Sequence, residues 1–508
     1  MTHPYTLVQS KKKNRYFVDQ KTKKITVCHP LLYHFLELKK NRIDVGEWIS
    51  QLPPGGFEIP ECGTFCSEEI NYYYQKYLFL EQNGHFDSGE KEELSEVLLT
   101  ADAVRYALAN TNQVVFECTD RCGMKCKYCG YGEFYTDYDS RENKILDPET
   151  GKKILDFMTG LWNSPSYKSY QNKVFVSFYG GEPLLNFPFI KEIVTYSGNL
   201  PLVHNRIRFS MTTNAEFLDK YMDFLAEHDF NLLISLDGSE ENNSYRVLQN
   251  GKPSFPKVLA NVKLLQEKYP DYFKRKVNFN AVLHNKNSVS EIFHFFKTEF
   301  DKIPRIGALN TSGINPEHIE TFKKTYVNVS ESLYNSEDYS LIEKEMFIQL
   351  PNIQNISMFF NQCNSLHFNN YNHLLTKESN NLRFPTGTCI PFSQKIFITV
   401  NGKIMACERI GQHFGLGKID ENGITLDFDE IANRYNAWWA KLKKQCSACY
   451  NSEHCLQCIF YLDITGDNPV CNGFMTPEDH SKHIASYFNY LETKPGLYDE
   501  ILRKVIIE

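Results

Sequence analysis

Three cysteines of this chain have the spacing of an iron–sulfur ligand loop. Cys122, Cys126 and Cys129 follow one another as Cys-x3-Cys-x2-Cys. Thiolate is the ligand that iron–sulfur clusters require, so three thiolates on a short loop can hold three corners of a [4Fe–4S] cube. The remaining iron then has no protein ligand, and an open metal position can bind and react with a small molecule. A structural zinc site is the alternative, but it takes four ligands, usually from two Cys-x2-Cys knuckles.

The cysteine loop follows an apolar run and opens a regular alternation of strand and helix patterns. Strands are predicted at 113–118, 173–179, 206–213, 230–236, 274–283 and 305–310. Helices are predicted between them at 152–162, 187–196, 216–228, 255–268 and 289–300. Such β/α units indicate a parallel sheet with helices outside, and functional side chains are then expected at the carboxyl ends of the strands.

A glycine turn after the second predicted strand completes a family resemblance. The sequence there is Gly180-Gly181-Glu182-Pro183, and glycine lets the backbone approach a ligand closely. With the three cysteines, and with Tyr128 next to the last of them, this turn resembles the motifs of the radical S-adenosylmethionine (SAM) enzymes. The resemblance implies an α/β fold with a (β/α)6 partial TIM barrel. It also implies a catalytic [4Fe–4S] cluster on the three cysteines, with SAM at its open iron.

Polar residues that end later strands extend the resemblance. Thr213-Asn214 and Ser235-Leu236-Asp237 are similar to strand ends of the family, although Ala215 stands where a glycine is usual. The resemblance implies SAM contacts from Tyr128, Gly180, Gly181, Glu182, Thr213, Asn214, Ser235, Asp237 and Arg246. Arg246 is predicted to pair with the SAM carboxylate, because a guanidinium fork matches a carboxylate. A surface position for Arg246 and a capping role for Asp237 are the alternatives.

A second group of cysteines lies near the carboxyl terminus. Its members are Cys389, Cys407, Cys446, Cys449, Cys455, Cys458 and Cys471. Strand patterns at 395–400 and 403–407 flank the turn Asn401-Gly402 and predict a hairpin, because Asn-Gly favours a type I′ turn. Such a hairpin returns Cys407 toward Cys389.

This second group resembles the SPASM domain, which holds auxiliary clusters in radical SAM enzymes that modify peptides. One spacing departs from its pattern, because two residues, not three, separate Cys455 from Cys458. The resemblance implies a distal [4Fe–4S] cluster on Cys446, Cys449, Cys455 and Cys471 and a proximal one on Cys389, Cys407 and Cys458. Lys395 stands where some relatives carry a further cysteine, so either Cys363 is the fourth proximal ligand or one iron is open. Structural zinc is the alternative for the whole group.

The first hundred residues form a separate unit by pattern. Strand patterns at 5–8, 16–19 and 24–27 precede a helical pattern, and this layout resembles the winged-helix-like peptide-recognition element of ribosomal-peptide maturases. That element adds a leader peptide to its sheet edge as a strand. A structural cap is the alternative. The predicted domains are a recognition unit with linker at 1–105, the core at 106–310, a bridge at 311–385, a SPASM domain at 386–480 and a final helix at 481–508. The bridge has a helical pattern at 317–333.

Charge and composition argue against several classes of protein. The formal net charge is −7, which argues against a general nucleic-acid or membrane-surface binder. No apolar run approaches the ~20 residues of a membrane span, and the first residues lack the apolar segment of a signal peptide. The 15 cysteines without such a signal suit a reducing compartment, so we expect a cytoplasmic protein.

The sequence therefore predicts an enzyme. It is expected to cleave SAM reductively to a 5′-deoxyadenosyl radical and to crosslink a ribosomally made precursor peptide, for example through a thioether or C–C bond. The expected cofactors are three [4Fe–4S] clusters and SAM. The expected partners are the precursor peptide with its leader and an electron donor such as flavodoxin or ferredoxin. The alternatives are an anaerobic sulfatase maturase that forms formylglycine and a zinc-stabilised peptide-binding scaffold without activity.

Overall fold

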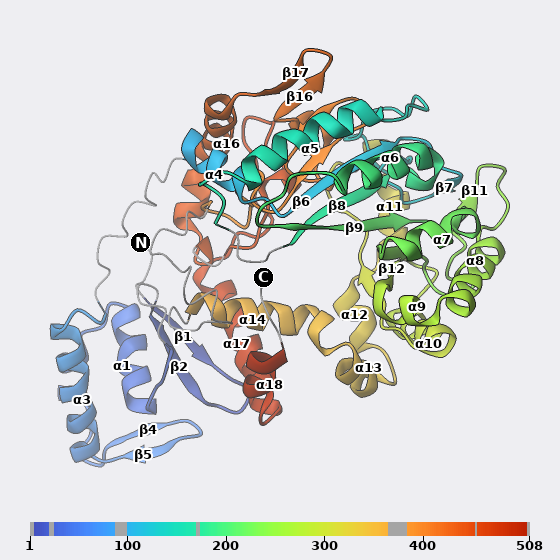
Figure 1. Cartoon of the computed structure of the whole chain (residues 1–508). Helices are drawn as coiled ribbons and strands as arrows, with labels where there is room; N and C mark the ends of the chain where they lie inside the picture. The colour runs from blue at the N-terminus through green and yellow to red at the C-terminus, as the bar shows by residue number, and fades with distance from the viewer. Residues whose placement is uncertain are drawn as a thin grey trace.

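A sheet of ten strands runs through the middle of the molecule in this computed structural model (Figure 1). The structure describes residues 5–19, 25–86, 99–168, 173–363, 384–452 and 455–504. The parallel strands of the core are β6 (Gln113–Thr119), β8 (Lys173–Gly180), β9 (Arg206–Thr213), β10 (Asn231–Ser235), β12 (Val277–Val282) and β13 (Arg305–Gly307). They lie in the order β13-β12-β10-β9-β8-β6, so the chain adds each strand beside the previous one. The predicted α/β core with parallel strands is confirmed.

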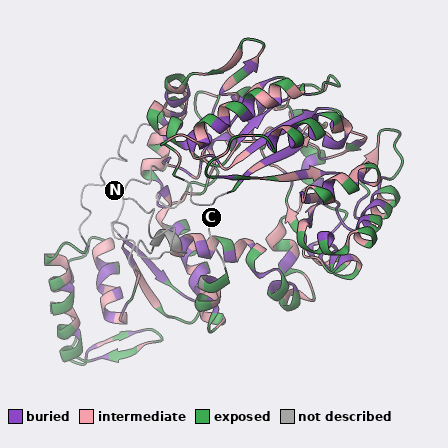
Figure 2. Cartoon of the chain, viewed as in Figure 1, coloured by how far each residue is buried: buried purple, intermediate pink, exposed green. Residues whose placement is uncertain are grey.

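Helices return the chain between these strands. They are α5 (Pro148–Trp162), α6 (Phe187–Ser197), α7 (Leu218–Glu227), α8 (Phe255–Lys268), α9 (Pro270–Lys276) and α10 (Val289–Phe300). The strands are largely buried, whereas the outer helix faces are exposed (Figure 2). The strand predicted at 274–283 is shorter than expected, because α9 extends to Lys276. Pro270 opens α9, and proline at the start of a helix favours helix formation there.

Four strands from the carboxy-terminal part of the chain extend the same sheet beyond β6. They are β14 (Ile396–Ile398), β15 (Lys403–Met405), β16 (Gly417–Asp420) and β17 (Gly423–Leu426). The predicted hairpin is confirmed, since β14 and β15 pair antiparallel around the Asn401-Gly402 turn. The sequence did not predict that β14 pairs in parallel with β6, with Ile396 opposite Val114. This pairing brings the hairpin turn to the carboxyl end of β6.

The amino-terminal unit contains a small antiparallel sheet and its own helices. Its elements are β1 (Tyr5–Gln9), β2 (Arg15–Asp19), β3 (Ile25–Val27), α1 (Pro30–Lys40), α2 (Val45–Ser50), β4 (Phe57–Ile59), β5 (Gly63–Phe65) and α3 (Ser67–Gln82). The sheet order is β1-β2-β3, so β3 is an edge strand. The unit packs on α17 (Pro477–Thr493), where Tyr16 stacks on Phe488 with 4.1 Å between ring centres. Ser481 Oγ of α17 also donates to the Leu7 carbonyl at 2.7 Å.

Further helices lie in the linker, the bridge and the carboxy-terminal part. They are α4 (Ala101–Ala109), α11 (Ile319–Thr325), α12 (Val329–Tyr334), α13 (Tyr339–Glu345), α14 (Pro351–Cys363), α16 (Phe428–Ala448) and α18 (Leu497–Lys504). The helix predicted at 317–333 is broken after Thr325, because the Asn328 side chain caps α12 by accepting from the Glu331 amide at 3.1 Å. The helix predicted at 481–508 is also two helices, since Gly496, with φ +84°, separates α17 from α18. None of the described helices is long and apolar enough to cross a bilayer.

Candidate active site

A cavity of about 180 Å³ lies at the carboxyl ends of the core strands. The predicted site residues that line it are Cys122, Cys126, Tyr128, Cys129, Gly180, Gly181, Thr213, Asn214, Ser235 and Arg246. Glu182 and Asp237 are not part of its lining, because both are fully buried beside residues that are. The structure thus brings the cysteine loop, the glycine turn and the ends of two further strands to one space.

The cysteine loop is held by contacts from distant segments. Its strand β7 (Met124–Cys126) pairs antiparallel with β11 (Arg246–Leu248), with Arg246 opposite Cys126. The Gln249 side chain donates to the Cys122 carbonyl at 2.9 Å. The Asn214 amide group lies 3.5 Å from the Cys122 sulfur. These contacts hold the loop against β11 and the end of β9.

The glycine turn joins the cysteine loop to the neighbouring strands. The Glu182 amide donates to the Arg121 carbonyl at 2.7 Å, and a Cβ on Gly181 would lie 2.1 Å from that same oxygen. The Glu182 carboxylate accepts from the Thr213 hydroxyl and from the Asn214 amide, both at 2.8 Å. Burial raises the pKa of Glu182 to about 7, although these hydrogen bonds oppose the shift. Glu182 therefore positions the strand end that carries two of the predicted SAM contacts.

Asp237 and Arg246 form a buried ion pair behind the cavity. Their side chains are 0% and 8% exposed, and Arg246 Nη2 lies 3.0 Å from Asp237 Oδ1. Tyr128 donates its hydroxyl to the same carboxylate. Burial raises the pKa of Asp237, but the charge of Arg246 and the hydrogen bonds outweigh burial, and the pKa is lowered overall. Arg246 thus binds Asp237 through Nη2, while its Nε has no hydrogen-bond partner among the described residues.

The chemistry of the three cysteines fits a cluster with one open position. All three are free thiols. Burial raises the pKa of Cys122 to about 11 and that of Cys126 to about 12, so both are protonated at neutral pH unless positive charge lies beside them. Iron supplies that charge, because a coordinated thiol loses its proton. The hydroxyl and amide groups of the strand ends suit a ligand with amino, carboxylate and hydroxyl groups.

Comparison with known proteins identifies this part of the chain. Residues 116–298 match the family model of the Radical SAM superfamily. The chain contains a radical SAM domain. Such domains define a superfamily of enzymes, and a radical SAM domain implies a [4Fe–4S] cluster and SAM.

Two curated relatives and one solved structure resemble the chain. It is 31% identical over 175 residues to an uncharacterised protein of Methanocaldococcus jannaschii. This match covers 34% of this chain and 54% of that protein. It is 27% identical over 232 residues to the cysteine-type anaerobic sulfatase-maturating enzyme of Clostridium novyi. This match covers 42% of this chain and 58% of that enzyme. The chain thus spans little more than half the length of these relatives. The structure titled "Native anSMEcpe with bound AdoMet and Cp18Cys peptide" shares the fold, with a TM-score of 0.51 at 17% identity over 77% of this chain and 99% of that chain.

Beyond the radical SAM domain, the predicted distal cysteines lie near one another. Burial, followed by the charges of Cys455, Cys471 and Cys449, raises the pKa of Cys446 to about 12. Among the described residues, no three His, Cys, Asp or Glu side chains converge closely enough to hold one metal ion. The cysteines of a cubane each bind a different iron and so lie farther apart than the ligands of one ion.

The predicted proximal cysteines lie close enough to Tyr435 of α16 to act on its phenol. Burial, followed by the charges of Cys458, Cys389 and Cys407, raises the pKa of the Tyr435 phenol well above its ordinary value. The phenol oxygen is buried and has no hydrogen-bond partner among the described residues. An orphaned donor beside three thiols fits a site that a cluster completes, because cluster sulfurs accept hydrogen bonds. Cys363, the candidate fourth ligand, ends α14, and its side chain lies outside the described residues.

The cavity also contains residues that the sequence analysis did not name. Phe397, Glu408 and Gln412 reach it from the carboxy-terminal segment, and Arg141 reaches it from the loop after the cysteines. Glu408 is the one described lining residue that carries a carboxylate, and Lys395 Nζ lies 3.0 Å from it. Its position directly after Cys407 was the available signal. The pairing of β14 with β6 is what brings this position to the cavity.

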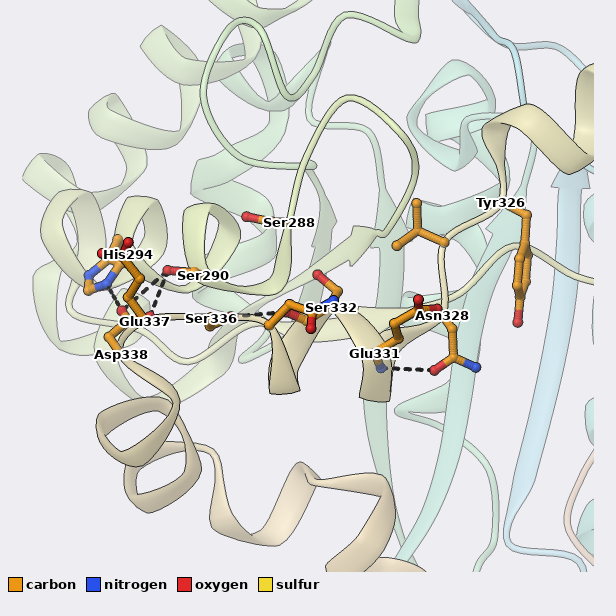
Figure 3. A pocket seen from close by; sticks show the side chains of 12 residues that line it. Ser288, Ser290, His294, Tyr326, Asn328, Glu331, Ser332, Ser336, Glu337 and Asp338 are labelled. Atoms are coloured by element: carbon orange, nitrogen blue, oxygen red, sulfur yellow. Dashed lines mark hydrogen bonds and ion pairs between the residues drawn. The ribbon is translucent and has the colours of Figure 1, made fainter.

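A larger cavity, of about 890 Å³, lies away from the radical SAM site, between α10, α12 and the segment that leads into α13 (Figure 3). Ser288, Asn328 and Ser332 contribute polar groups to it, and His294 forms an ion pair with Asp338. None of its described lining residues is a cysteine or a predicted site residue. Cavity volume alone therefore does not locate the active site. The smaller cavity is the candidate, because the three predicted cluster cysteines line it.

Proposed function

We propose that this chain is a radical SAM peptide maturase. It cleaves SAM reductively and uses the resulting radical to modify a ribosomally made precursor peptide, with a thioether or C–C crosslink as the product. The observation that carries the proposal is the shared cavity, which the three cysteines, the glycine turn and the carboxy-terminal hairpin line together. The solved structure with the same fold is described as having AdoMet and a peptide bound, and this supports a peptide substrate.

Three [4Fe–4S] clusters and SAM are the proposed cofactors. Cys122, Cys126 and Cys129 hold the catalytic cluster, and the two carboxy-terminal cysteine groups hold the auxiliary ones. When bound and reduced, the catalytic cluster supplies the electron that splits SAM into methionine and a 5′-deoxyadenosyl radical. The glycine turn presents backbone groups to SAM, and the strand-end side chains orient it. A protein electron donor such as flavodoxin or ferredoxin, and a cytoplasmic location, belong to the same proposal.

Glu408 is the proposed proton acceptor. Its side chain is 14% exposed, lines the cavity and pairs with Lys395. Crosslinking removes a hydrogen atom, an electron and a proton from the peptide. The 5′-deoxyadenosyl radical would take the hydrogen atom and an auxiliary cluster the electron, and a carboxylate within reach can take the proton. The ion pair with Lys395 holds the carboxylate in position, which suits that role.

The amino-terminal unit is the proposed binding site for the leader peptide. Its edge strand β3 exposes Val27, and α3 exposes Tyr72 and Phe79, at 73%, 58% and 63%. The His29 ring, two residues after β3, stacks on Tyr73 of α3 with 3.7 Å between ring centres, so the two elements adjoin. An open edge and exposed aromatic rings suit an added peptide strand. Phe79→Asp should weaken leader binding, and unchanged affinity would leave the unit a structural cap.

A sulfatase maturase that forms formylglycine is the second candidate. The match to the sulfatase-maturating enzyme of Clostridium novyi favours it. The amino-terminal unit favours a leader-guided maturase, because leader recognition requires a separate binding surface. Incubation with a sulfatase peptide containing cysteine separates the two, since formylglycine formation without any leader would support the second candidate. Membership of an enzyme superfamily argues against the non-enzymatic zinc scaffold.

Replacement of Cys122, Cys126 and Cys129 together by Ala tests the proposal. In anaerobically reconstituted protein reduced with dithionite, the variant should form no 5′-deoxyadenosine. It should also lose about four irons per chain, the content of one cubane. Cys62→Ala, outside the proposed ligand groups, is the control and should keep both properties. Formation of 5′-deoxyadenosine by the triple variant would refute the assignment, and colourless, zinc-loaded wild type would favour the scaffold.

A further inference from the structure

Arg141 contacts a cluster cysteine from outside every motif of the sequence. Its Nη2 donates to the Cys129 sulfur at 3.3 Å, and its guanidinium lies 4.5 Å from the centre of the Tyr131 ring. Arg141 also lines the cavity, and its buried Nε has no partner among the described residues. The guanidinium is therefore placed by one ring and by one sulfur.

Tyr131 is in turn held by a buried carboxylate. Its hydroxyl donates to Glu117 Oε1, and it accepts from Gln412 Nε2 at 3.3 Å. Glu117 is 1% exposed and stands near the end of β6. Its second oxygen, Oε2, accepts from the Val400 amide at 2.8 Å. Val400 lies in the hairpin turn between β14 and β15, so Glu117 connects that hairpin to the ring beneath Arg141.

Further bonds tie the Arg141 loop to the same carboxy-terminal segment. The Gln412 amide donates to the Asp137 carbonyl at 2.8 Å, and Gln412 Oε1 accepts from the Asp139 amide at 2.9 Å. Lys403 Nζ lies 2.8 Å from the Asp139 carboxylate. The loop that carries Arg141 therefore depends on the carboxy-terminal hairpin for its position.

A cationic donor at a ligand sulfur has a defined effect on a cluster. Hydrogen bonds to the sulfurs and net charge set the potential of iron–sulfur clusters. Reduction adds negative charge, and a guanidinium next to a ligand sulfur stabilises that charge. A hydrogen bond to Cys129 should therefore make the cluster easier to reduce, and easier reduction matters because SAM cleavage begins with that electron.

We propose that Arg141, positioned by Tyr131 and Glu117 against the carboxy-terminal hairpin, sets the reduction potential of the catalytic cluster. Arg141 is here a positioning and tuning residue rather than a ligand. The proposal rests on the proposed catalytic cluster. It also gives the carboxy-terminal segment a second task, because docking of its hairpin fixes the donor that acts on a cluster held by another domain.

The test is an electron paramagnetic resonance titration of anaerobically reconstituted full-length protein. The catalytic cluster is recognised as the signal that changes when SAM is added. In Arg141→Gln its equilibrium constant for reduction should fall at least about threefold, which is about 28 mV to more negative potential at 59 mV per tenfold change. Arg141→Lys, which keeps the charge, should recover part of the shift. Arg208→Gln, at an exposed position in the amino-terminal half of β9, is the control and should match wild type.

The outcomes separate this proposal from the proposed function. Absence of any SAM-sensitive signal in wild type would refute the catalytic cluster itself. A SAM-sensitive signal with equal potentials in wild type and Arg141→Gln, at equal iron content, would overturn the role of Arg141. If Arg141→Gln loses iron, Tyr131→Phe decides, since it keeps the ring beneath the guanidinium and removes the hydroxyl that bonds to Glu117 and Gln412. A shift in the same direction supports the relay, and an unchanged potential overturns it.

Discussion

Lys395 Nζ lies 3.0 Å from Glu408 Oε1, and the two side chains are only 23% and 14% exposed. The pair stands beside the cavity that the cluster cysteines line, with Glu408 in its wall. The resemblance to SPASM domains implies a cysteine in some relatives at the position that Lys395 occupies here. In this chain that position supports a carboxylate instead of adding a thiolate.

Glu408→Gln should reduce peptide modification by about 100-fold or more, because a positioned proton acceptor contributes about 10²–10⁴-fold. Formation of 5′-deoxyadenosine without peptide should continue, since the variant leaves the cluster cysteines intact. Both products can be quantified by mass spectrometry. Glu430→Gln, at an exposed position in the first turn of α16, is the matched control. Equal peptide modification by Glu408→Gln and Glu430→Gln would exclude the role.

Asp237→Asn should destabilise the radical SAM domain by about 3–5 kcal/mol, because removal of one partner leaves the buried charge of Arg246 uncompensated. Thermal unfolding under anaerobic conditions measures the effect. Glu299→Gln breaks the exposed pair that Lys263 and Glu299 form at 2.7 Å, and it should cost about 1 kcal/mol or less. Similar losses in the two variants would show that the buried pair has no special weight.

Gly181→Ala should destabilise the protein by about 1–3 kcal/mol and disturb SAM binding, because the added Cβ would lie 2.1 Å from the Arg121 carbonyl oxygen. The carbonyl belongs to the backbone of the cysteine loop, so relief of the collision moves that loop. Gly160→Ala is the opposite case, since a Cβ there meets no atom within 4 Å on the surface of α5. It should stabilise the helix by about 1 kcal/mol. A SAM dissociation constant for Gly181→Ala equal to that of wild type would contradict the close approach.

Glu117→Gln should change how stability depends on pH. Burial is the largest cause that raises the pKa of Glu117 from 4.5 to about 7, so between these values the folded state holds a proton that the unfolded chain has released. The free energy of unfolding of wild type should therefore fall as pH rises from about 5 to 7, by up to about 3 kcal/mol from this group. The variant lacks that titration. Its melting temperature relative to wild type should rise across this window, and a constant difference would refute the shift.

Cys363→Ala tests whether the proximal auxiliary cluster has an open iron. Unchanged iron content, with a spectral change of the reduced auxiliary clusters only when peptide is added, is the expected result. An open iron can bind a substrate thiol, because a coordinated thiol loses its proton. Loss of about four irons per chain would make Cys363 a ligand and end the open-site proposal.

Local features of the sequence carried much of the assignment. The spacing of Cys122, Cys126 and Cys129 is a property of one short loop, and cluster ligation needs only thiolates at that spacing. The Gly180-Gly181 turn is equally local. The alternation of strand and helix patterns predicted the parallel core, because hydrophobic periodicity reflects which face of each element is buried. Predictions failed at 274–276 and 326–328, where Pro270 and the Asn328 cap altered the local preference.

The tertiary structure decided which distant residues meet the cluster loop. Glu408 reaches the cavity because β14 pairs with β6, and no pattern within either strand specifies that neighbour. Arg246 pairs with Asp237, and Arg141 contacts Cys129, through packing between segments that the sequence separates. Ligand spacing follows from covalent geometry and can be read along the chain. Contacts between elements depend instead on which buried surfaces fit together, and that fit exists only in the folded protein.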